Sequence, residues 1–476
     1  MVLILCFIGL IAFTWYAWTS FNPLHTNRRI FKIPGNPEQK FLMPRGMFYI
    51  TFIVVSAPLF LGNLSLIKYF VFFLISVYYI LNYKFNNLLR GGPIVISYML
   101  FLLWLIVTWV YSPYPYYGFL NIVKYSLPLV ALWVAYNALR TKEDLIVFLK
   151  LTCYGLIFYV FWVSGIAFKF YPVIAYSPLG AGIFSIAAAL SDYFVALFTA
   201  PIILAVLTGQ KRWYILCGLL FLSAIFYSIR TSIAASLISL GVYLLMRYKL
   251  NAVPGLIALV IGFASIVVYV PEINQKFFYG VDKKDYTVEQ IATGEVGFDD
   301  MQTNARDYMW TKAMGMYYHG QELTGNGLGS TAFGMKSHLI HPQLELIHSD
   351  YVQLLCDSGI ISVILLGIFV IITLVTILWY GQPYLGEYTA LTGWLAASSL
   401  CGILFSMAFD NVVSTSMTSL CISFILIGFF LKFKDLYRYV EEKDFTAEIL
   451  EEDTDEDSEQ EYPPQLEAES KIPMRK

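Results

Sequence analysis

The sequence predicts an all-α polytopic membrane protein, with about 12–13 transmembrane helices and one long helical loop outside the membrane. Three observations support this fold class. First, 58% of the 476 residues are hydrophobic and only 13% are charged, which is far from the composition of a soluble domain. Second, thirteen apolar runs are long enough to cross about 30 Å of hydrocarbon. Third, lysine and arginine are concentrated in every second connection between these runs.

The apolar runs form two blocks on either side of one long connection. Ten runs fall within residues 1–270 and three within residues 360–432. In chain order they lie near 1–18, 46–62, 65–82, 94–111, 118–137, 145–167, 190–208, 213–229, 231–247, 253–270, 360–380, 389–409 and 414–431. Met1 leads directly into apolar residues without a positively charged segment, so residues 1–18 are expected to remain as a helix.

The positive charges predict the orientation of the chain in a bilayer. They cluster after the first run and then in every second connection, as in the pairs Arg140 with Lys142 and Lys211 with Arg212. Cytoplasmic loops carry an excess of lysine and arginine, so the chain is expected to begin outside and end inside. The connection 271–359 then lies on the outer face. We expect a multi-pass membrane protein with this loop on the outer side.

The C-terminal tail, the cysteines and the absence of nucleic-acid motifs exclude other classes of protein. Residues 433–476 form a polar tail in which Glu441–Lys476 holds 14 acidic and 4 basic residues, a pattern typical of a disordered cytoplasmic segment. The six cysteines lie in or beside apolar runs without paired spacing, so they are interpreted as buried apolar residues. No nucleic-acid-binding module is present in the sequence.

The long outer connection has its own helical pattern. Asn304–Tyr318 is predicted to be a helix, and the glycine-rich stretch 324–330 a turn. A second helix is expected from Pro342 to Cys356, with Gly359 ending it. Four of the five histidines lie in this connection, and His341, Glu345 and His348 could place ligands on one helix face. A polar helix face explains the same residues better than a metal site, because zinc sites usually show tighter histidine pairing.

The ionisable residues near the apolar runs predict where the chemistry occurs. Lys68, Lys124, Asp192, Arg230 and Asp410 all fall at or near the outer ends of their runs, and none lies at the midplane. An ion-coupled transporter needs carboxylates near the middle of the bilayer. The tyrosine-rich stretch 111–117 and residues 170–176 also lie outside. They suit an interfacial aromatic belt, and some rings could instead stack on sugar faces.

Two arginines and a histidine could form a site for a phosphorylated lipid on the outer face. The planar guanidinium matches phosphate with two hydrogen bonds and stays charged, so Arg230 at a helix junction and Arg306 above it could hold a pyrophosphate. His348 could accept the proton of an incoming hydroxyl. Each residue also has a structural alternative. Arg230 could mark an interfacial turn, Arg306 could solvate its helix, and His348 could cap or solvate its own helix.

Three segments together resemble the O-antigen ligase and O-antigen polymerase superfamily of bacterial membrane proteins. They are the stretch 228–235 (SIRTSIAA), the run 306–310 (RDYMW) followed by 325–329 (GNGLG), and the stretch 348–359 (HSDYVQLLCDSG). The resemblance covers about residues 180–430. Ser349 replaces the usual asparagine and Asp357 the usual glutamate. The family often has a further arginine before the run at 190–208, which this chain lacks, and Lys169 or Lys124 could substitute for it.

The resemblance implies a metal-independent glycosyltransferase that needs no cofactor. It would move a glycan from undecaprenyl diphosphate to an acceptor hydroxyl at the outer face of the cytoplasmic membrane. The resemblance thus implies a multi-pass protein of the bacterial inner membrane, with the loop 271–359 in the periplasm and the C-terminus in the cytoplasm. Arg230 and Arg306 would bind the diphosphate, and His348 would act as base or would orient the acceptor hydroxyl. Tyr351 and Lys124 are further candidates for binding substrate. The partners would be the lipid-linked glycan, its acceptor and membrane lipid, with no nucleic acid.

Several alternatives to this function remain at the level of sequence. The acceptor could be lipid A core for a ligase, another lipid-linked repeat for a polymerase, or a protein serine or threonine for an oligosaccharyltransferase. We favour a ligase or polymerase because no large extra domain follows Gly359 on the outer side. A transporter or flippase would need a polar path across the bilayer, for which the apolar runs provide little. A third alternative is a non-enzymatic scaffold that recruits partners through the acidic tail.

Overall fold

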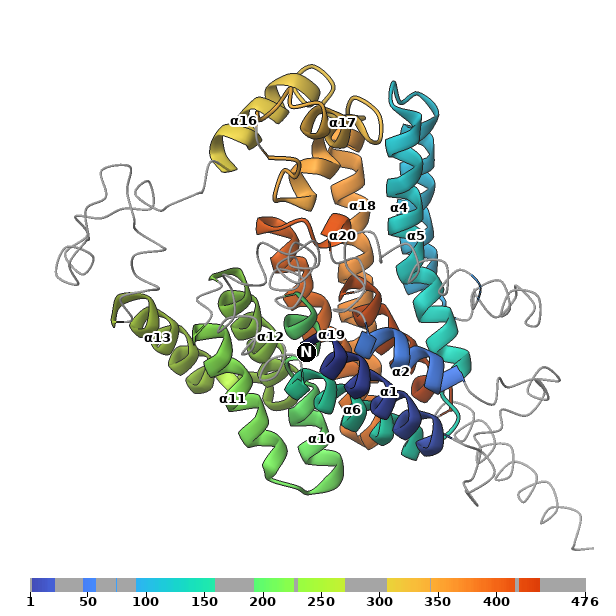
Figure 1. Ribbon diagram of the computed structural model, residues 1–476, viewed down its shortest axis with the longest axis vertical. Coiled ribbons are helices and arrows are strands. Elements are labelled where there is room, and N and C mark those ends of the chain that lie inside the picture. The colour runs from blue at the N-terminus through green and yellow to red at the C-terminus, as the bar shows by residue number, and fades with distance from the viewer. Residues whose placement is uncertain are drawn as a thin grey trace, which may run out of the picture.

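The computed structural model of the chain is built from helices (Figure 1). It describes residues 2–21, 46–56, 74, 91–158, 192–226, 230–269, 306–342, 344–415 and 419–436. Within these ranges every regular element is an α-helix or a short 3-10 turn, and no strand occurs. Predictions for the run 65–82, for residues 170–176 and for the acidic tail fall outside the described residues, apart from the single residue Leu74.

Five helical segments among the described residues are long and apolar enough to cross a membrane. They are α4 (Pro93–Val110), α5 (Pro115–Ala138), the segment Arg230–Tyr269, α18 (Asp350–Tyr380) and α19 (Glu387–Phe409). The segment Arg230–Tyr269 comprises α12 (Arg230–Tyr248), the 3-10 turn η7 (Lys249–Ala252) and α13 (Val253–Tyr269). These helices support the prediction of a helical membrane protein.

Further helices complete the described part of the bundle. They are α1 (Val2–Ser20), α2 (Gly46–Ser56), α6 (Lys142–Ile157), α10 (Ala200–Thr208), α11 (Arg212–Phe226), the 3-10 turn η9 (Pro383–Leu385), α20 (Val412–Thr415) and a helix at 419–436. Hydropathy predicts the helix bounds closely in several places. The run at 94–111 corresponds to α4, and the run at 389–409 to α19. Apolar length determines both boundaries, because the flanking residues carry proline, glycine or charge.

The bundle packs around α18 and α19. Helix α4 lies along α18, and α12 lies along α19. Tyr98, Phe369 and Phe424 form an aromatic cluster in this core, with the rings of Phe369 and Phe424 stacked at a centroid distance of 5.2 Å. Large apolar side chains also point away from the protein, and Val110 is 78% and Trp379 71% exposed. Exposed apolar faces of this kind are typical of helices that contact lipid.

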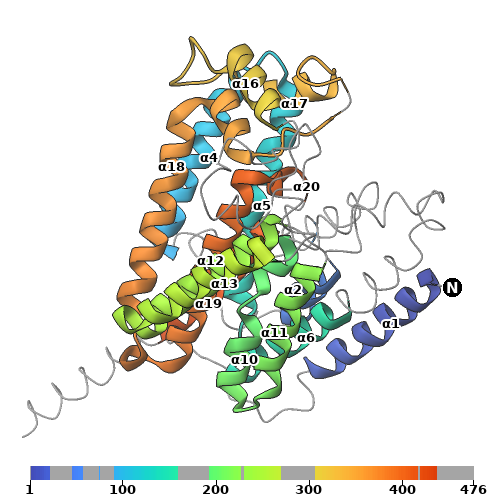
Figure 2. The ribbon, with the colours of Figure 1, turned by 90° about the vertical axis from the view of Figure 1, so that its left-hand side faces the viewer.

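Two further helices, α16 (Arg306–Tyr317) and α17 (Ser330–Lys336), lie beyond one end of the long helices (Figures 1 and 2). They share a small core of their own, which includes Met309, Ala313, Met335 and Ile347. The prediction of a helix at Asn304–Tyr318 is therefore confirmed over Arg306–Tyr317, and residues 304 and 305 lie outside the described residues. Helix α17 was not predicted from the sequence. This small unit covers the end of the bundle at which α18 begins.

The predicted second helix from Pro342 to Cys356 is wrong in its first half. Helix α18 begins at Asp350, and Ser349 caps it by accepting a hydrogen bond from the Val352 backbone N–H. Serine is a strong N-cap residue, and this cap outcompetes the weaker start signal of Pro342. His348 lies just outside the helix in the left-handed region, with φ of 55°. The helix start therefore places His348 in a turn, not on a helix face.

Gly359 divides α18 into a short N-terminal helix and a long apolar one. It adopts φ of 69° and ψ of −177°, a conformation that only glycine adopts readily. Leu323 packs against it so closely that a Cβ atom on Gly359 would collide with the Leu323 carbonyl group. The Ile360 backbone N–H, freed by this kink, donates to the Glu322 carbonyl at 2.8 Å. The glycine at this position is thus required by the contact between the loop and α18.

The glycine-rich loop 325–329 fastens α17 to the bundle. Its glycines have positive φ, and a Cβ atom on Gly325 would lie 2.5 Å from the Ser358 backbone nitrogen. Asp357 is fully buried and accepts hydrogen bonds from the Gly329 N–H at 3.0 Å and the Thr331 N–H at 2.7 Å. The carboxylate therefore holds the start of α17, where backbone donors lack partners within the helix.

Candidate functional site

His348 and Asp410 form the centre of the candidate site. The His348 Nδ1 atom lies 3.4 Å from the Asp410 Oδ1 atom, although the two residues are 62 positions apart in the chain. His348 follows the α16–α17 unit directly, and Asp410 ends α19 as its C-cap residue. The side chains are 32% and 21% exposed, respectively. Both therefore remain accessible at the end of the bundle.

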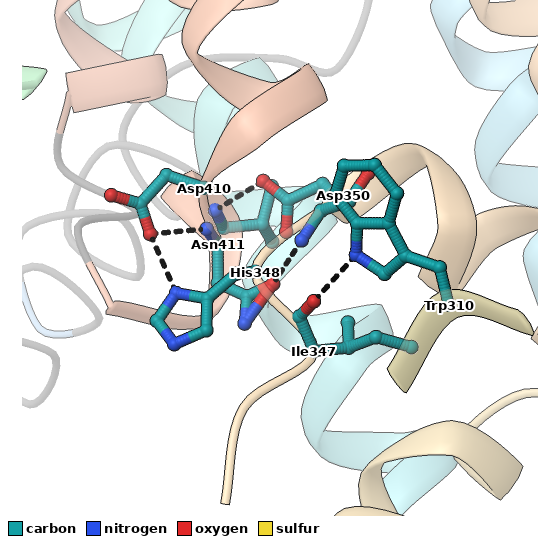
Figure 3. Close-up of polar contacts among 8 residues, drawn as sticks. Trp310, Ile347, His348, Asp350, Asp410 and Asn411 are labelled. Carbon is teal, nitrogen blue, oxygen red and sulfur yellow. Dashed lines mark hydrogen bonds and ion pairs between the residues drawn. The ribbon is translucent and has the colours of Figure 1, made fainter. Parts of the chain in front are cut away.

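A pair of reciprocal hydrogen bonds holds the two segments together (Figure 3). The Asn411 side-chain oxygen accepts from the Ser349 backbone N–H at 3.1 Å. In return, the Asp350 Oδ2 atom accepts from the Val413 backbone N–H at 3.0 Å. Asp350 and Asn411 are each only 1% exposed. These two hydrogen bonds form a clamp between the segments that carry His348 and Asp410. Because the clamp consists of buried polar groups with defined partners, it fixes His348 relative to Asp410.

Helix α16 supports the same segment from above. The Trp310 indole N–H donates to the Ile347 carbonyl at 2.8 Å, one residue before His348 (Figure 3). Trp310 lies one helical turn after Arg306, so the same helix positions both the support and the arginine. Arg306 and Trp310 are four residues apart on α16 and therefore lie on the same face of the helix.

Arg306 and Arg230 bring positive charge to the site from two different helices. Each begins its helix, α16 and α12 respectively, and their charges are close enough to repel one another. Burial lowers the pKa of Arg306, and the nearby Asp410 carboxylate opposes this effect. Arginine remains protonated in proteins, so both side chains stay cationic. Two half-buried arginines held near each other favour an anion between or beside them.

Lys124 lies close to the same cluster on the α5 side. Its charge interacts with that of Asp350 and with Lys336 on α17. The Asp350 Oδ1 atom is buried and has no hydrogen-bond partner in the part of the chain that the structure describes. Asp192 also contributes a buried carboxylate that interacts with Asp350 and Asp410. The site therefore combines several carboxylates with three cationic side chains that the sequence separates widely.

Tyr351 is the one predicted site residue whose polar atom serves helix packing. Its hydroxyl donates to the Leu404 carbonyl on α19 at 3.0 Å. The Leu404 carbonyl can accept this bond in addition to its hydrogen bond within α19. The bond from Tyr351 therefore docks α18 against α19. His348, Arg230, Arg306 and Lys124 are gathered by the fold, whereas Tyr351 lies beside them with its hydroxyl already engaged.

Sequence reasoning missed Asp410 as the partner of His348, and it missed the roles of Asp350 and Asn411. The sequence places Asp410 near the outer end of its apolar run, and this position is the signal that could have pointed to its role. Only folding shows that this end meets the start of α18. Asp350 follows His348 by two residues, and nothing in the sequence indicates that its partner is the backbone of Val413.

The other histidines of the outer connection do not join this site. His341 Nδ1 accepts from the Leu344 backbone N–H at 3.1 Å, which gives it a local structural role. Within the described residues, no group of three histidine, cysteine, aspartate or glutamate side chains is arranged to hold a metal ion. Cys153, Cys217, Cys356 and Cys421 are buried, as predicted, and Cys401 is half-buried; none of these five residues forms a disulfide.

Two aromatic rings that could have been sugar platforms are engaged within the protein. Tyr114 stacks on Phe333 of α17 with a centroid distance of 3.9 Å. The Tyr111 hydroxyl donates to the Thr324 carbonyl at 2.6 Å. Both contacts fasten the turn between α4 and α5 to the α17 unit. Tyr116 is 68% exposed, and Tyr111 remains 46% exposed.

The arrangement can accept a proton and stabilise negative charge in the same place. If Nδ1 of His348 donates to the Asp410 carboxylate, which only accepts, then Nε2 is left as an acceptor for a proton. Arg306 and Arg230 supply positive charge that could stabilise an anion beside the histidine. Searches with protein-family models and against curated proteins find no match for the chain.

Proposed function

We propose that the chain transfers a glycan from undecaprenyl diphosphate to an acceptor hydroxyl, in the manner of an O-antigen ligase or polymerase. The single observation that carries this proposal is the His348–Asp410 pair beside Arg306 and Arg230 at one end of the apolar helices. A base, an orienting carboxylate and paired guanidinium groups are what such a transfer needs. The resemblance of the stretches around Arg230, Arg306 and His348 to that superfamily adds support.

The proposed step is a displacement at the anomeric carbon of the donor sugar. The acceptor oxygen forms a bond to this carbon while its proton passes to Nε2 of His348. The bond between the anomeric carbon and the diphosphate oxygen breaks, and its electron pair leaves with undecaprenyl diphosphate. Arg306 and Arg230 stabilise the charge that develops on this leaving group. Asp410 orients the imidazole and stabilises the imidazolium form.

The same proposal includes the membrane arrangement of the chain. We infer about 12–13 transmembrane helices in the bacterial inner membrane, with residues 271–359 in the periplasm and the C-terminus in the cytoplasm. Positive charges in alternate connections support this orientation. The α16–α17 unit would then cover the site on the periplasmic face, where lipid-linked glycans and their acceptors meet. Lys124 would add a third cation to the donor site.

The deciding experiment mixes the purified chain with a lipid-linked glycan and an acceptor, and measures release of free undecaprenyl diphosphate. We expect His348→Ala to lower the rate by about 10²–10⁴-fold, because a positioned general base contributes that factor. The matched control is His338→Ala, which removes an exposed histidine of the same unit. The control should retain transfer. Full activity of His348→Ala would remove the base from the mechanism.

The same assay separates the enzyme from a lipid transporter. A flippase would relocate intact donor without releasing undecaprenyl diphosphate, so donor cleavage distinguishes the two. Replacing the acceptor in turn by lipid A core, a second lipid-linked repeat or a serine-containing peptide then separates ligase, polymerase and protein oligosaccharyltransferase. We expect one of the two glycan acceptors to support the faster reaction.

A further inference from the structure

An apolar groove lies between α6 and α11, away from the residues around His348. Its volume is about 460 Å³, within the range of about 300–1,000 Å³ usual for small-molecule sites. Tyr154 and Ile157 of α6 form one side, and the face of α11 from Arg212 to Leu219 forms the other. Arg212 is the one charged residue in this lining. The groove therefore has an apolar body and a cationic end.

The side chains of the groove show which surface faces outward. Trp213 and Leu216 are only 3% and 5% exposed and form its base. Ile215 and Leu219 are 64% and 44% exposed, so apolar atoms line its open side. The Tyr154 ring of α6 and the Trp213 ring of α11 lie 5.7 Å apart between centroids, so the two sides of the groove are in contact there. An open apolar groove on a membrane helix fits a hydrocarbon chain.

The charged end of the groove is suited to an anion. The Arg212 guanidinium carbon lies 5.0 Å from the centre of the Trp213 ring, and the preceding residue, Lys211, is exposed in the turn after α10. No aspartate or glutamate occurs in the sequence from 193 to 271, so this stretch of chain supplies no carboxylate to neutralise the two cations. Positive charge at the boundary of an apolar helix attracts anionic headgroups.

The length of the groove matches part of a lipid tail. Arg212 and Leu219 are seven residues apart on one helix, which corresponds to about 10 Å at 1.5 Å per residue. One leaflet of the hydrocarbon core is about 15 Å thick, half of the full thickness. A tail whose phosphate lies at Arg212 would thus follow α11 over most of one leaflet.

We propose that this groove binds an anionic phospholipid, with an acyl chain against Trp213, Leu216 and Leu219 and its phosphate against Arg212 and Lys211. The site lies at the end of α11 that is predicted to face the cytoplasm. It does not depend on the proposed transferase function. The binding would anchor α11 against α6 through a bound lipid in addition to direct contacts between the two helices.

The test uses the full chain reconstituted with phospholipids whose acyl chains carry bromine, which quenches tryptophan fluorescence on contact. The chain has 10 tryptophans, so the signal of Trp213 is obtained as the difference between the wild type and Trp213→Phe. We expect brominated phosphatidylglycerol to quench this signal at a lower mole fraction than brominated phosphatidylcholine. The preference should be roughly fivefold for each cation that takes part.

Two variants assign the preference to the groove. The double substitution Lys211→Gln with Arg212→Gln should abolish it, because both residues are exposed and the substitution removes both positive charges. The matched control Lys249→Gln removes an exposed cation from the turn after α12 and should leave it unchanged. Equal quenching by the two lipids in the wild type would overturn the proposal. So would a preference that survives the double substitution, or one lost equally in the control.

Discussion

Two buried carboxylates on the same short helix differ in what they do. Asp357 is fully buried, and its two oxygens accept hydrogen bonds from the Gly329 and Thr331 backbone N–H groups. Asp350 lies seven positions earlier and is 1% exposed, but only one of its oxygens has a hydrogen-bond partner among the described residues. Asp357 is thus committed to the fold. Asp350 belongs to a charged cluster that retains unused hydrogen-bonding capacity.

The difference extends to the regions around these carboxylates. Around Asp357, glycines and backbone hydrogen bonds fasten the α17 unit to the bundle, and Gly359 lets α18 kink beneath it. Around Asp350, charged side chains from α5, α12 and α16 form an electrostatic cluster with Asp410, and Asp410 contacts His348. Residues in the first region should affect stability when changed, and residues in the second should affect activity. His348→Ala tests the second region, and variants of Gly359, Asp357, Asp410 and Tyr351 test the division between the two.

Gly359→Ala should destabilise the protein the most among the variants of the loop region. The positive φ and extended ψ of this residue cost a side chain about 1–3 kcal/mol, and the collision with Leu323 adds to this cost. We expect a total of about 3 kcal/mol or more, measured as loss of folded protein and a lower melting temperature in detergent. The catalytic rate per folded molecule should change little.

Gly367→Ala is the matched control for that variant. It lies on the same helix, and a Cβ atom added there meets no heavy atom within 4 Å. Alanine is also the better helix former by about 1 kcal/mol, so this variant should be neutral or slightly stabilising. Equal destabilisation by the two substitutions would contradict the account of Gly359.

Asp357→Asn should cost about 1–3 kcal/mol of unfolding free energy. Asparagine keeps the size of the side chain but replaces one acceptor oxygen by a donor, so one of the two N–H groups at the start of α17 loses its partner. Thermal unfolding in detergent measures this loss. The exposed Asp307 of α16 provides the control Asp307→Asn, which should have no measurable effect. If Asp357→Asn left stability intact but abolished transfer, Asp357 would belong to the site instead.

Asp410→Asn should have a smaller effect on stability that depends on pH. Burial raises the pKa of Asp410, but the hydrogen bonds from His348 and the Asn411 N–H, together with the charge of Arg306, outweigh it and lower the pKa overall. A lowered folded pKa means that the carboxylate stabilises the fold above the unfolded value of about 3.9. This stabilisation is lost as the pH falls through the folded pKa.

The measurement compares the melting temperatures of the wild type and Asp410→Asn at pH 7 and below pH 4. We expect a difference of roughly 1 kcal/mol at pH 7, because the pair is partly exposed, and convergence of the two proteins in acid. Transfer at pH 7 should fall mainly through kcat, because Asp410 acts on His348 and not on the donor. A stability difference that is independent of pH would show that Asp410 contributes by packing alone.

The sequence predicts the helices better than it predicts their contacts. Hydropathy locates α4 and α19 within a few residues, because apolar length and flanking charge determine where a membrane helix begins and ends. The helix-start signal of Pro342 fails, because a side-chain cap by Ser349 decides the start of α18. Capping depends on a single hydrogen bond, which a hydrophobic pattern does not detect.

The candidate site was predicted in its residues but not in its connections. Chemistry singled out His348, Arg230 and Arg306, since phosphate binding and proton transfer need those side chains. The pairing of His348 with Asp410 joins residues 62 positions apart, and the clamp of Asp350 with Val413 uses a backbone group. Contacts of this kind arise from packing of α18 on α19. No local pattern in the sequence encodes them.

Tyr351→Phe tests the boundary between the two regions with the smallest expected effect. The Tyr351 hydroxyl donates to the Leu404 carbonyl at 3.0 Å, so its loss should cost about 1 kcal/mol of stability, the usual net contribution of one hydrogen bond. If the residue only docks α18 on α19, KM for the lipid-linked donor should remain unchanged while the melting temperature falls slightly. A substrate-binding role would reverse this outcome, because KM would rise in a variant of unchanged stability. Since the hydroxyl is already engaged beside the charged cluster, we expect the first result.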